Sequence, residues 1–231
     1  AWVEEDNPQL WPGFDQSSLN INNEFGAQIQ QGADSYISET SSQPTTLNLE
    51  PANDSITGNS LGWGWSTNPT EAIFVDSKLN GYGQLANTIE ADLASSGRTG
   101  RIVIINDSQS AYEQIDLALS GMSQLAAIHI FSHGEAGAIR LNGELLSEQE
   151  LSSESNLISS WGQALRSDGD ILLYGCGIGA GSIGSSYLQT LAAITGADIA
   201  ASVDATGDTN LGGDWLLESQ VGAIETVALS P

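Results

Sequence analysis

The sequence predicts a three-layer α/β/α sandwich built around a mostly parallel sheet, and two observations support this prediction. From residue 71 onward, short runs of consecutive apolar residues alternate with stretches in which apolar residues recur at helical spacing. Strands of a parallel sheet that is covered on both faces are apolar on both sides, so they appear as continuous apolar runs. Parallel strands need long crossover connections, which are usually helices, and this accounts for the alternation.

Five apolar runs are predicted as strands because each is short, continuous and mostly aliphatic. In chain order they span residues 72–76, 101–106, 126–131, 171–174 and 199–203. Four intervening stretches are predicted as helices because apolar residues recur in them about three or four positions apart. In the same order these residues are Leu85, Ile89 and Leu93; Tyr112, Ile115 and Leu119; Leu157, Ile158, Trp161 and Leu165; and Tyr187, Leu188, Leu191 and Ile194.

Two small hairpins are expected beside this core. The first turns at Asn142-Gly143, a pair that favours the type I′ turn of a two-residue hairpin. The second is expected near the C-terminus, with residues 215–218 and 223–227 as its two strands.

The chain is strongly acidic, and this excludes several classes of partner. It has 231 residues, with 29 Asp and Glu against 5 Lys and Arg, and a formal net charge of −24. Contact with nucleic-acid phosphates or anionic lipid headgroups requires basic residues, so neither partner is expected. No apolar stretch approaches the roughly 20 residues that cross a bilayer, so membrane insertion is not expected either.

Composition divides the chain near residue 70. Residues 1–70 hold five of the six prolines and four of the six tryptophans, and they hold no Lys, Arg or His. We interpret this part as an acidic, loop-rich extension or pro-segment, and residues 71–231 as the α/β domain. A partly ordered linker is the alternative interpretation for residues 1–70.

Two reactive side chains follow predicted strands. Cys176, the sole cysteine, follows the run at 171–174 within Gly175-Cys176-Gly177. His133 follows the run at 126–131, between Ser132 and Gly134. If these strands are neighbours, they lie about 4.8 Å apart, and their carboxyl ends open on the edge of the sheet where ligands bind.

A thiol and an imidazole in this position are suited to nucleophilic catalysis. The thiolate is the nucleophile, and a neighbouring imidazole promotes its formation and later protonates the leaving group. Gly134 and Gly175 permit close approach of a substrate backbone, and N–H groups there can stabilise an oxyanion. A lone cysteine at a strand end is also often a packing residue. His129 lies within a strand and is expected to be structural.

These motifs resemble those of the caspase-like clan (clan CD) of cysteine peptidases, which includes caspases, metacaspases, gingipains, clostripain, separase and the self-cleaving domains of large toxins. More closely, residues 71–218 resemble a bacterial domain family of unassigned function found near the N-termini of giant, repeat-rich, often calcium-binding secreted or surface proteins. The matching stretches are residues 73–77, 128–138, 170–176, 191–202 and 212–215.

The resemblance implies a role for each candidate residue. Cys176 would attack the scissile carbonyl, His133 would act as acid and base, and the backbone N–H groups of Gly134 and Cys176 would form the oxyanion hole. Asp204 follows the next strand and would face a basic substrate residue, although a turn or capping role is the alternative for this aspartate.

The activity expected from this resemblance is peptide-bond hydrolysis by a Cys-His dyad, and the substrate is a peptide or protein. One candidate substrate is the large secreted or cell-surface parent of this domain, cleaved by autoprocessing. Two alternatives remain: a non-catalytic structural or adhesin module that keeps the fold, and a zymogen blocked by its N-terminal segment.

No cofactor or metal is expected, with calcium as the alternative. The loop from Asp204 to Asp214 offers the oxygen ligands Asp208, Asn210 and Asp214, but it misses the EF-hand template. The glycine-rich segment at 175–181 lacks the lysine of a phosphate-binding loop.

Overall fold

The computed structural model describes residues 69–231, so the extension predicted at residues 1–70 lies almost wholly outside the described residues. Helices and strands follow one another in the order β1 (Glu71–Asp76), α2 (Tyr82–Ser95), β2 (Gly100–Ile105), α3 (Ala111–Leu119), β3 (Leu125–Phe131), β4 (His133–Glu135), β5 (Ala138–Leu141), β6 (Glu144–Ser147), α4 (Glu148–Ser153), α5 (Ser155–Ala164), β7 (Leu165–Tyr174), α6 (Gly181–Thr195), β8 (Asp198–Ala201), the 3₁₀ helix η2 (Thr209–Leu211) and β9 (Ser219–Val221).

The central sheet has six strands in the order β2-β1-β3-β7-β8-β9. The first five pair in parallel, and β9 joins the edge of β8 in the antiparallel direction. All six residues of β1 are buried, as expected for a strand covered on both faces. The predicted mostly parallel sheet is therefore confirmed.

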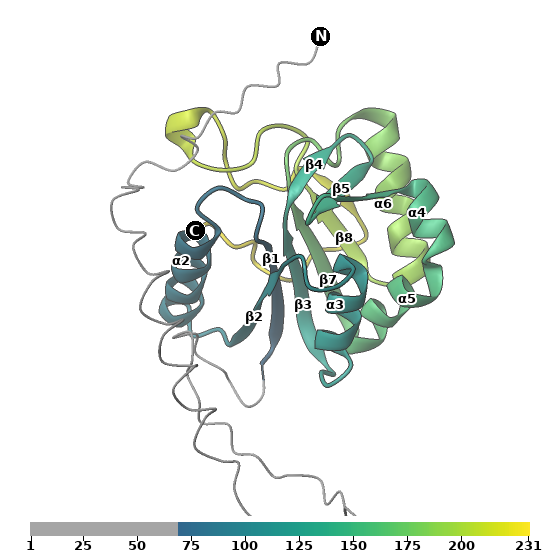
Figure 1. Cartoon of the computed structure of the whole chain (residues 1–231), viewed down its shortest axis with the longest axis horizontal. Coiled ribbons are helices and arrows are strands. Elements are labelled where there is room, and N and C mark those ends of the chain that lie inside the picture. Colours follow the sequence, from purple (N-terminus) through teal and green to yellow (C-terminus); the bar gives the residue numbers. More distant parts are fainter. Residues whose placement is uncertain (1–68) are drawn as a thin grey trace, which may run out of the picture. The chain divides into compact units, whose positions relative to one another are not determined.

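Helices cover both faces of this sheet and complete the three-layer α/β/α sandwich. Figure 1 shows α2 and the C-terminus on one side, and α3, α4, α5 and α6 on the other. On the first side, Leu85, Ile89 and Leu93 of α2 pack with Ile73 and other strand residues. The larger cluster on the second side includes residues of α3, α5 and α6. The four predicted helices are all present.

A second, three-stranded antiparallel sheet, β4-β5-β6, follows β3. The predicted Asn142-Gly143 turn joins β5 to β6, and both residues have positive φ values, 52° and 83°. A type I′ turn requires positive φ at both positions, so the first hairpin is confirmed. The short strand β4 was not predicted, and it contains His133.

The second predicted hairpin is wrong. Residues 215–218 form no strand, and β9, at 219–221, pairs with β8 instead of with residues 223–227. The backbone groups of β9 are satisfied by the edge of the main sheet, and the segment after β9 crosses the sheet face beside α2. Leu229 of this C-terminal segment is buried there, as is Leu217, which precedes β9.

Helix α5 crosses α6 at close range. A Cβ atom added at Gly162 of α5 would lie 1.8 Å from the carbonyl oxygen of Thr195, at the end of α6. Among residues 69–231, the longest helix has 15 residues, and none combines the length and apolar character required to cross a bilayer.

Candidate active site

The two strands that precede His133 and Cys176 are neighbours in the sheet. Strands β3 and β7 pair in parallel up to Phe131 and Tyr174, and the N–H of Ser132 then donates to the Tyr174 carbonyl at 3.1 Å. His133 and Cys176 each come two residues after this last pair. Because side chains alternate along a strand, this equal spacing places them at matching positions of the two strand exits.

A pocket of about 130 Å³ lies at this edge of the sheet, and both His133 and Cys176 line it. Its walls come from the segments that follow β1, β3, β7 and β8, which is the carboxyl edge where α/β sheets bind ligands. Both residues are also exposed to solvent. The structure thus brings the two predicted catalytic residues to one accessible pocket.

Two glycines allow the strand exits to lie against each other. A Cβ atom at Gly134 would lie 3.0 Å from the carbonyl oxygen of Cys176 and 2.5 Å from Ile178. A Cβ atom at Gly175 would lie 3.0 Å from the carbonyl oxygen of Ser132. Side chains at either position would force the exits apart, so glycine at both positions explains how His133 and Cys176 come to share one pocket.

The chain turns sharply after Cys176. Gly177 has a φ of 66°, and its N–H donates to the carbonyl of Asp204 at 2.7 Å. Among residues 69–231, the N–H of Cys176 donates no hydrogen bond. The Cys176 Sγ contacts the carbonyl oxygen of Thr206 at 4.0 Å. Within the same residues, the His133 imidazole forms no hydrogen bond.

Aromatic rings form one wall of the pocket. Phe131 and Tyr174 stack with ring centroids 4.2 Å apart and planes 4° apart. Trp215 packs edge-on against Phe131 at 5.9 Å, and all three residues line the pocket. Sequence reasoning missed this wall, since Trp215 comes from the segment that was expected to form the second hairpin.

A buried polar network lies beneath the aromatic wall. Arg98 donates two hydrogen bonds to the Glu71 carboxylate, at 2.8 and 2.7 Å, and His129 Nε2 lies 2.9 Å from the same carboxylate. His129 Nδ1 lies 3.1 Å from the Tyr174 hydroxyl, which accepts the N–H of Leu229 at 2.8 Å. His129 is fully buried, so the prediction of a structural histidine is confirmed.

Protonation within this network follows from burial and hydrogen bonding. Burial lowers the pKa of His129 below its usual 6.5, although the hydrogen bond with Glu71 opposes this effect. Burial alone would raise the pKa of Glu71, but the hydrogen bonds from His129 and Arg98 lower it below its usual 4.5. A neutral His129 therefore donates its Nε2–H to the Glu71 carboxylate. The Nδ1 atom of His129 then accepts a hydrogen bond from the Tyr174 hydroxyl.

Asp204 does not line the pocket, whereas the nearby Asp208 does. Asp204 is exposed, and its backbone carbonyl accepts from Gly177. The role of Asp204 in substrate binding stays a prediction. Asp208 is a second candidate, because its side chain belongs to a residue that lines the pocket. In the sequence, Asp208 stands out only as a possible calcium ligand.

Two of the three residues that offer calcium ligands in this loop bond to each other. Asp208 caps η2 by accepting the backbone and side-chain N–H groups of Asn210, at 2.7 and 2.9 Å. Asp214 lies instead near Asp204 and Glu218, so that one oxygen of each falls within 4.8 Å of the others. These three residues are exposed or half-buried, and a second acidic group, described below, occurs at the opposite end of the sheet.

Comparison with protein-family models assigns the chain to one family. A family described as a domain of unknown function (DUF4347) matches residues 72–231. This match includes every element of the sandwich after the first residue of β1, and the chain belongs to this family. A search of the curated proteins found no match.

Proposed function

We propose that this domain is a cysteine endopeptidase that uses Cys176 and His133 as a catalytic dyad. The observation that carries the proposal is their convergence on one exposed pocket from the adjacent exits of β3 and β7. Membership of the caspase-like clan is part of the proposal. It is supported by the mostly parallel sheet and by a histidine and a cysteine that follow neighbouring strands.

The proposed reaction proceeds in two steps. His133 accepts the thiol proton of Cys176, and the thiolate forms a bond to the scissile carbonyl carbon. The resulting oxyanion accepts hydrogen bonds from the backbone N–H groups of Cys176 and Gly134. Collapse of this intermediate breaks the C–N bond, and His133 donates its proton to the leaving amine.

Water completes the reaction. His133 removes a proton from a water molecule, whose oxygen attacks the acyl carbon and displaces the Cys176 thiolate. His133 then returns its proton to the Cys176 thiolate, and the products are a carboxylic acid and the free enzyme. No third residue is required, since the imidazole alone transfers both protons.

The pocket favours a long basic side chain of the substrate. The half-buried indole of Trp215 suits an aliphatic stem and a cation, and Asp208 supplies a carboxylate. The domain has few basic residues, namely Lys78, Arg98, Arg101, Arg140 and Arg166. Residues 1–68 contain neither Lys nor Arg, so cleavage at a basic residue within them is excluded. Processing elsewhere in a large secreted or surface parent protein is the favoured biological role.

Peptide cleavage tests this proposal. Fluorogenic peptides that differ only in having Arg, Lys, Asp or Leu before the scissile bond are incubated with the wild type and with Cys176→Ala. We expect cleavage after Arg or Lys by the wild type and none by Cys176→Ala. Asp208→Asn should lower kcat/KM for the Arg peptide about 10-fold or more, because a charge-assisted hydrogen bond is lost. The matched variant Asp204→Asn removes a nearby carboxylate that does not line the pocket, so its kcat/KM is compared with that of Asp208→Asn.

Equal cleavage by wild type and Cys176→Ala would identify a contaminating peptidase and contradict the proposal. If neither protein cleaves any peptide, removal of residues 1–68 distinguishes the two alternatives. Activity that appears after removal identifies a zymogen, and continued inactivity favours the non-catalytic structural or adhesin module.

A further inference from the structure

Two aspartates lie side by side at the end of the sheet remote from the candidate active site. Asp170 of β7 and Asp198 of β8 are directly paired in the parallel register. Neighbouring positions on adjacent strands are close enough for like charges to repel, and such a pair is unfavourable unless something compensates it. Asp170 is fully buried, and Asp198 is half-buried.

The carboxylate of Asp170 is only partly satisfied. Its Oδ2 accepts the backbone N–H of Thr226 at 2.8 Å, but its Oδ1 is buried and has no hydrogen-bond partner. A buried carboxylate oxygen without a partner is costly, because it has lost its hydration without replacement. The structure thus holds an unpartnered anionic oxygen beside a second carboxylate.

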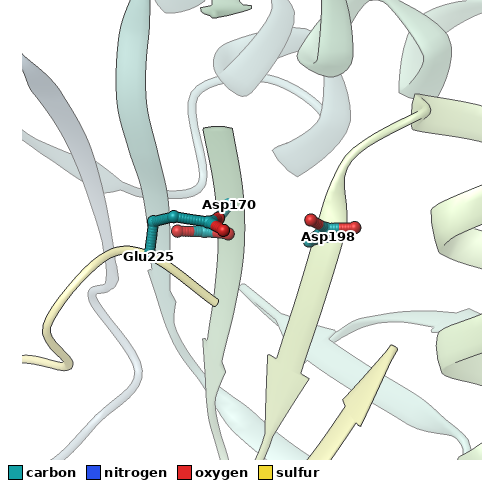
Figure 2. A group of neighbouring side chains, drawn as sticks. All are labelled: Asp170, Asp198 and Glu225. Atoms are coloured by element: carbon teal, nitrogen blue, oxygen red, sulfur yellow. The ribbon is translucent and has the colours of Figure 1, made fainter. Parts of the chain in front are cut away.

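A third carboxylate comes from the C-terminal segment. Figure 2 shows Glu225 beside Asp170, with Asp198 on the neighbouring strand. One oxygen from each of the three side chains lies within 4.8 Å of the others. Gly222 packs against Asp198 so closely that an added Cβ atom would lie 1.7 Å from its Oδ1. The C-terminal segment therefore confines the Asp198 carboxylate as well as contributing Glu225.

Within the described residues, no salt bridge involves this group. Among residues 69–231, the salt bridges pair Lys78 with Asp107, Arg98 and His129 with Glu71, Arg140 with Glu135, and Arg166 with Asp168. None of them includes a member of the acidic group. Three neighbouring carboxylates, one of them buried and none of them in a salt bridge, repel one another, and a bound cation would offset this repulsion.

We propose that Asp170, Asp198 and Glu225 bind a calcium ion that ties the C-terminal segment to β7 and β8. Calcium accepts six to eight oxygen ligands at about 2.3–2.6 Å, so oxygens on opposite sides of one ion lie about 4.8 Å apart. The spacing of the three oxygens fits this span. Glu225 is exposed, so water can supply the remaining ligands.

Calcium fits this group better than magnesium. Magnesium requires near-ideal octahedral geometry at about 2.1 Å and gives up its water reluctantly. A site with one confined, one buried and one exposed carboxylate is irregular, and calcium tolerates irregular coordination. This site is unrelated to the loop at 204–214, and it does not depend on the proposed peptidase activity.

Thermal unfolding and calorimetry of the full chain test the proposal. The protein is freed of metal with a chelator, and its Tm is measured with added CaCl₂ or MgCl₂ at constant ionic strength. At a hundredfold excess of calcium over its Kd, Tm should rise by about 5–10 °C. Magnesium should produce a smaller rise.

Four variants locate the site. Asp198→Asn and Glu225→Gln should each weaken calcium binding about 10-fold or more, and without metal their Tm should equal or exceed that of the wild type, because repulsion is relieved. Glu218→Gln controls for the other acidic group, and Glu113→Gln controls for an exposed acid on α3. Both controls should keep the wild-type response.

Several outcomes would overturn the proposal. A wild-type Tm that does not rise with calcium excludes the site, and equal responses to calcium and magnesium exclude its selectivity. A calcium response that survives in both Asp198→Asn and Glu225→Gln places the ion elsewhere in the chain.

Discussion

His129 bonds to both Glu71 and Tyr174 in a buried network, and its contribution to the stability of the protein depends on pH. The pKa of His129 lies below 6.5 in the folded protein because burial disfavours the charged form. As the pH falls, the unfolded chain therefore takes up this proton before the folded one does. The stability contributed by neutral His129 is complete above pH 6.5 and is lost as the pH falls from 6.5 toward the lower folded pKa.

This argument predicts the effect of replacing the histidine. Between pH 6.5 and pH 5, His129→Gln should reduce the slope of unfolding free energy against pH by up to about 1.4 kcal/mol per unit. Glu71 does not interfere in this range, since its pKa lies below 4.5 and its contribution is lost only at lower pH. Urea unfolding at several pH values measures the slope. Identical slopes in wild type and variant would show that His129 does not titrate differently on folding.

Residue chemistry at the site was partly visible in the sequence. The thiol of Cys176 and the imidazole of His133 stand out because each follows an apolar run and is flanked by glycine. The role of Asp170 was not visible, since an aspartate before a strand is usually a polar boundary residue. Only the register of β7 with β8 and the return of the C-terminal segment show that Asp170, Asp198 and Glu225 meet.

At the scale of elements, the strands and helices with regular spacing were predicted, as was the hairpin of β5 and β6, whereas β4, α4, η2 and β9 were not. The capping-box pattern of Ser147 and Glu150 marks the start of α4, and it was overlooked because α4 has only six residues. The segment after η2 was misinterpreted for a different reason. Two apolar-containing stretches flank a short turn as in a hairpin, but β9 pairs with the edge of β8.

The contact between the exits of β3 and β7 makes a prediction about Gly134. A Cβ atom at this position would meet the backbone of Gly175 and Cys176 at 3.0 Å, so Gly134→Ala should destabilise the protein by about 1–3 kcal/mol. Gly83→Ala is the matched control, because nothing lies within 4 Å of its added Cβ atom in α2. The control should be neutral or stabilising by up to about 1 kcal/mol.

Denaturant unfolding of the two variants measures both effects. Equal stability of Gly134→Ala and the wild type would mean that the strand exits can separate without cost. That result would remove the structural reason for a shared pocket.

At the scale of the whole molecule, the two candidate sites lie at opposite ends of the sheet. Its carboxyl edge bears the pocket with Cys176 and His133, and its opposite end bears the acidic group. Strand β7 contributes to both, with Asp170 in its middle and Tyr174, which lines the pocket, at its end. The C-terminal segment follows the same path, since Thr226 bonds to Asp170 and Leu229 to Tyr174.

The net charge of −24 also belongs to this scale. Self-repulsion of so many carboxylates opposes the compact state, and salt or a bound cation reduces it. The prediction that anionic partners are excluded rests on this charge. A pocket that favours a basic substrate residue agrees with it, because the field of the whole molecule attracts cations.

The most direct test of the central claim is the rate at which iodoacetamide alkylates Cys176 in the wild type and in His133→Gln. A thiolate held by His133 reacts fast at pH 6.5, where a free cysteine is almost wholly protonated. We predict that the wild type reacts at least about 10-fold faster than His133→Gln at pH 6.5, and that the two rates converge at pH 9.5. Equal rates at pH 6.5, with both as slow as a free thiol, would contradict a Cys176-His133 dyad.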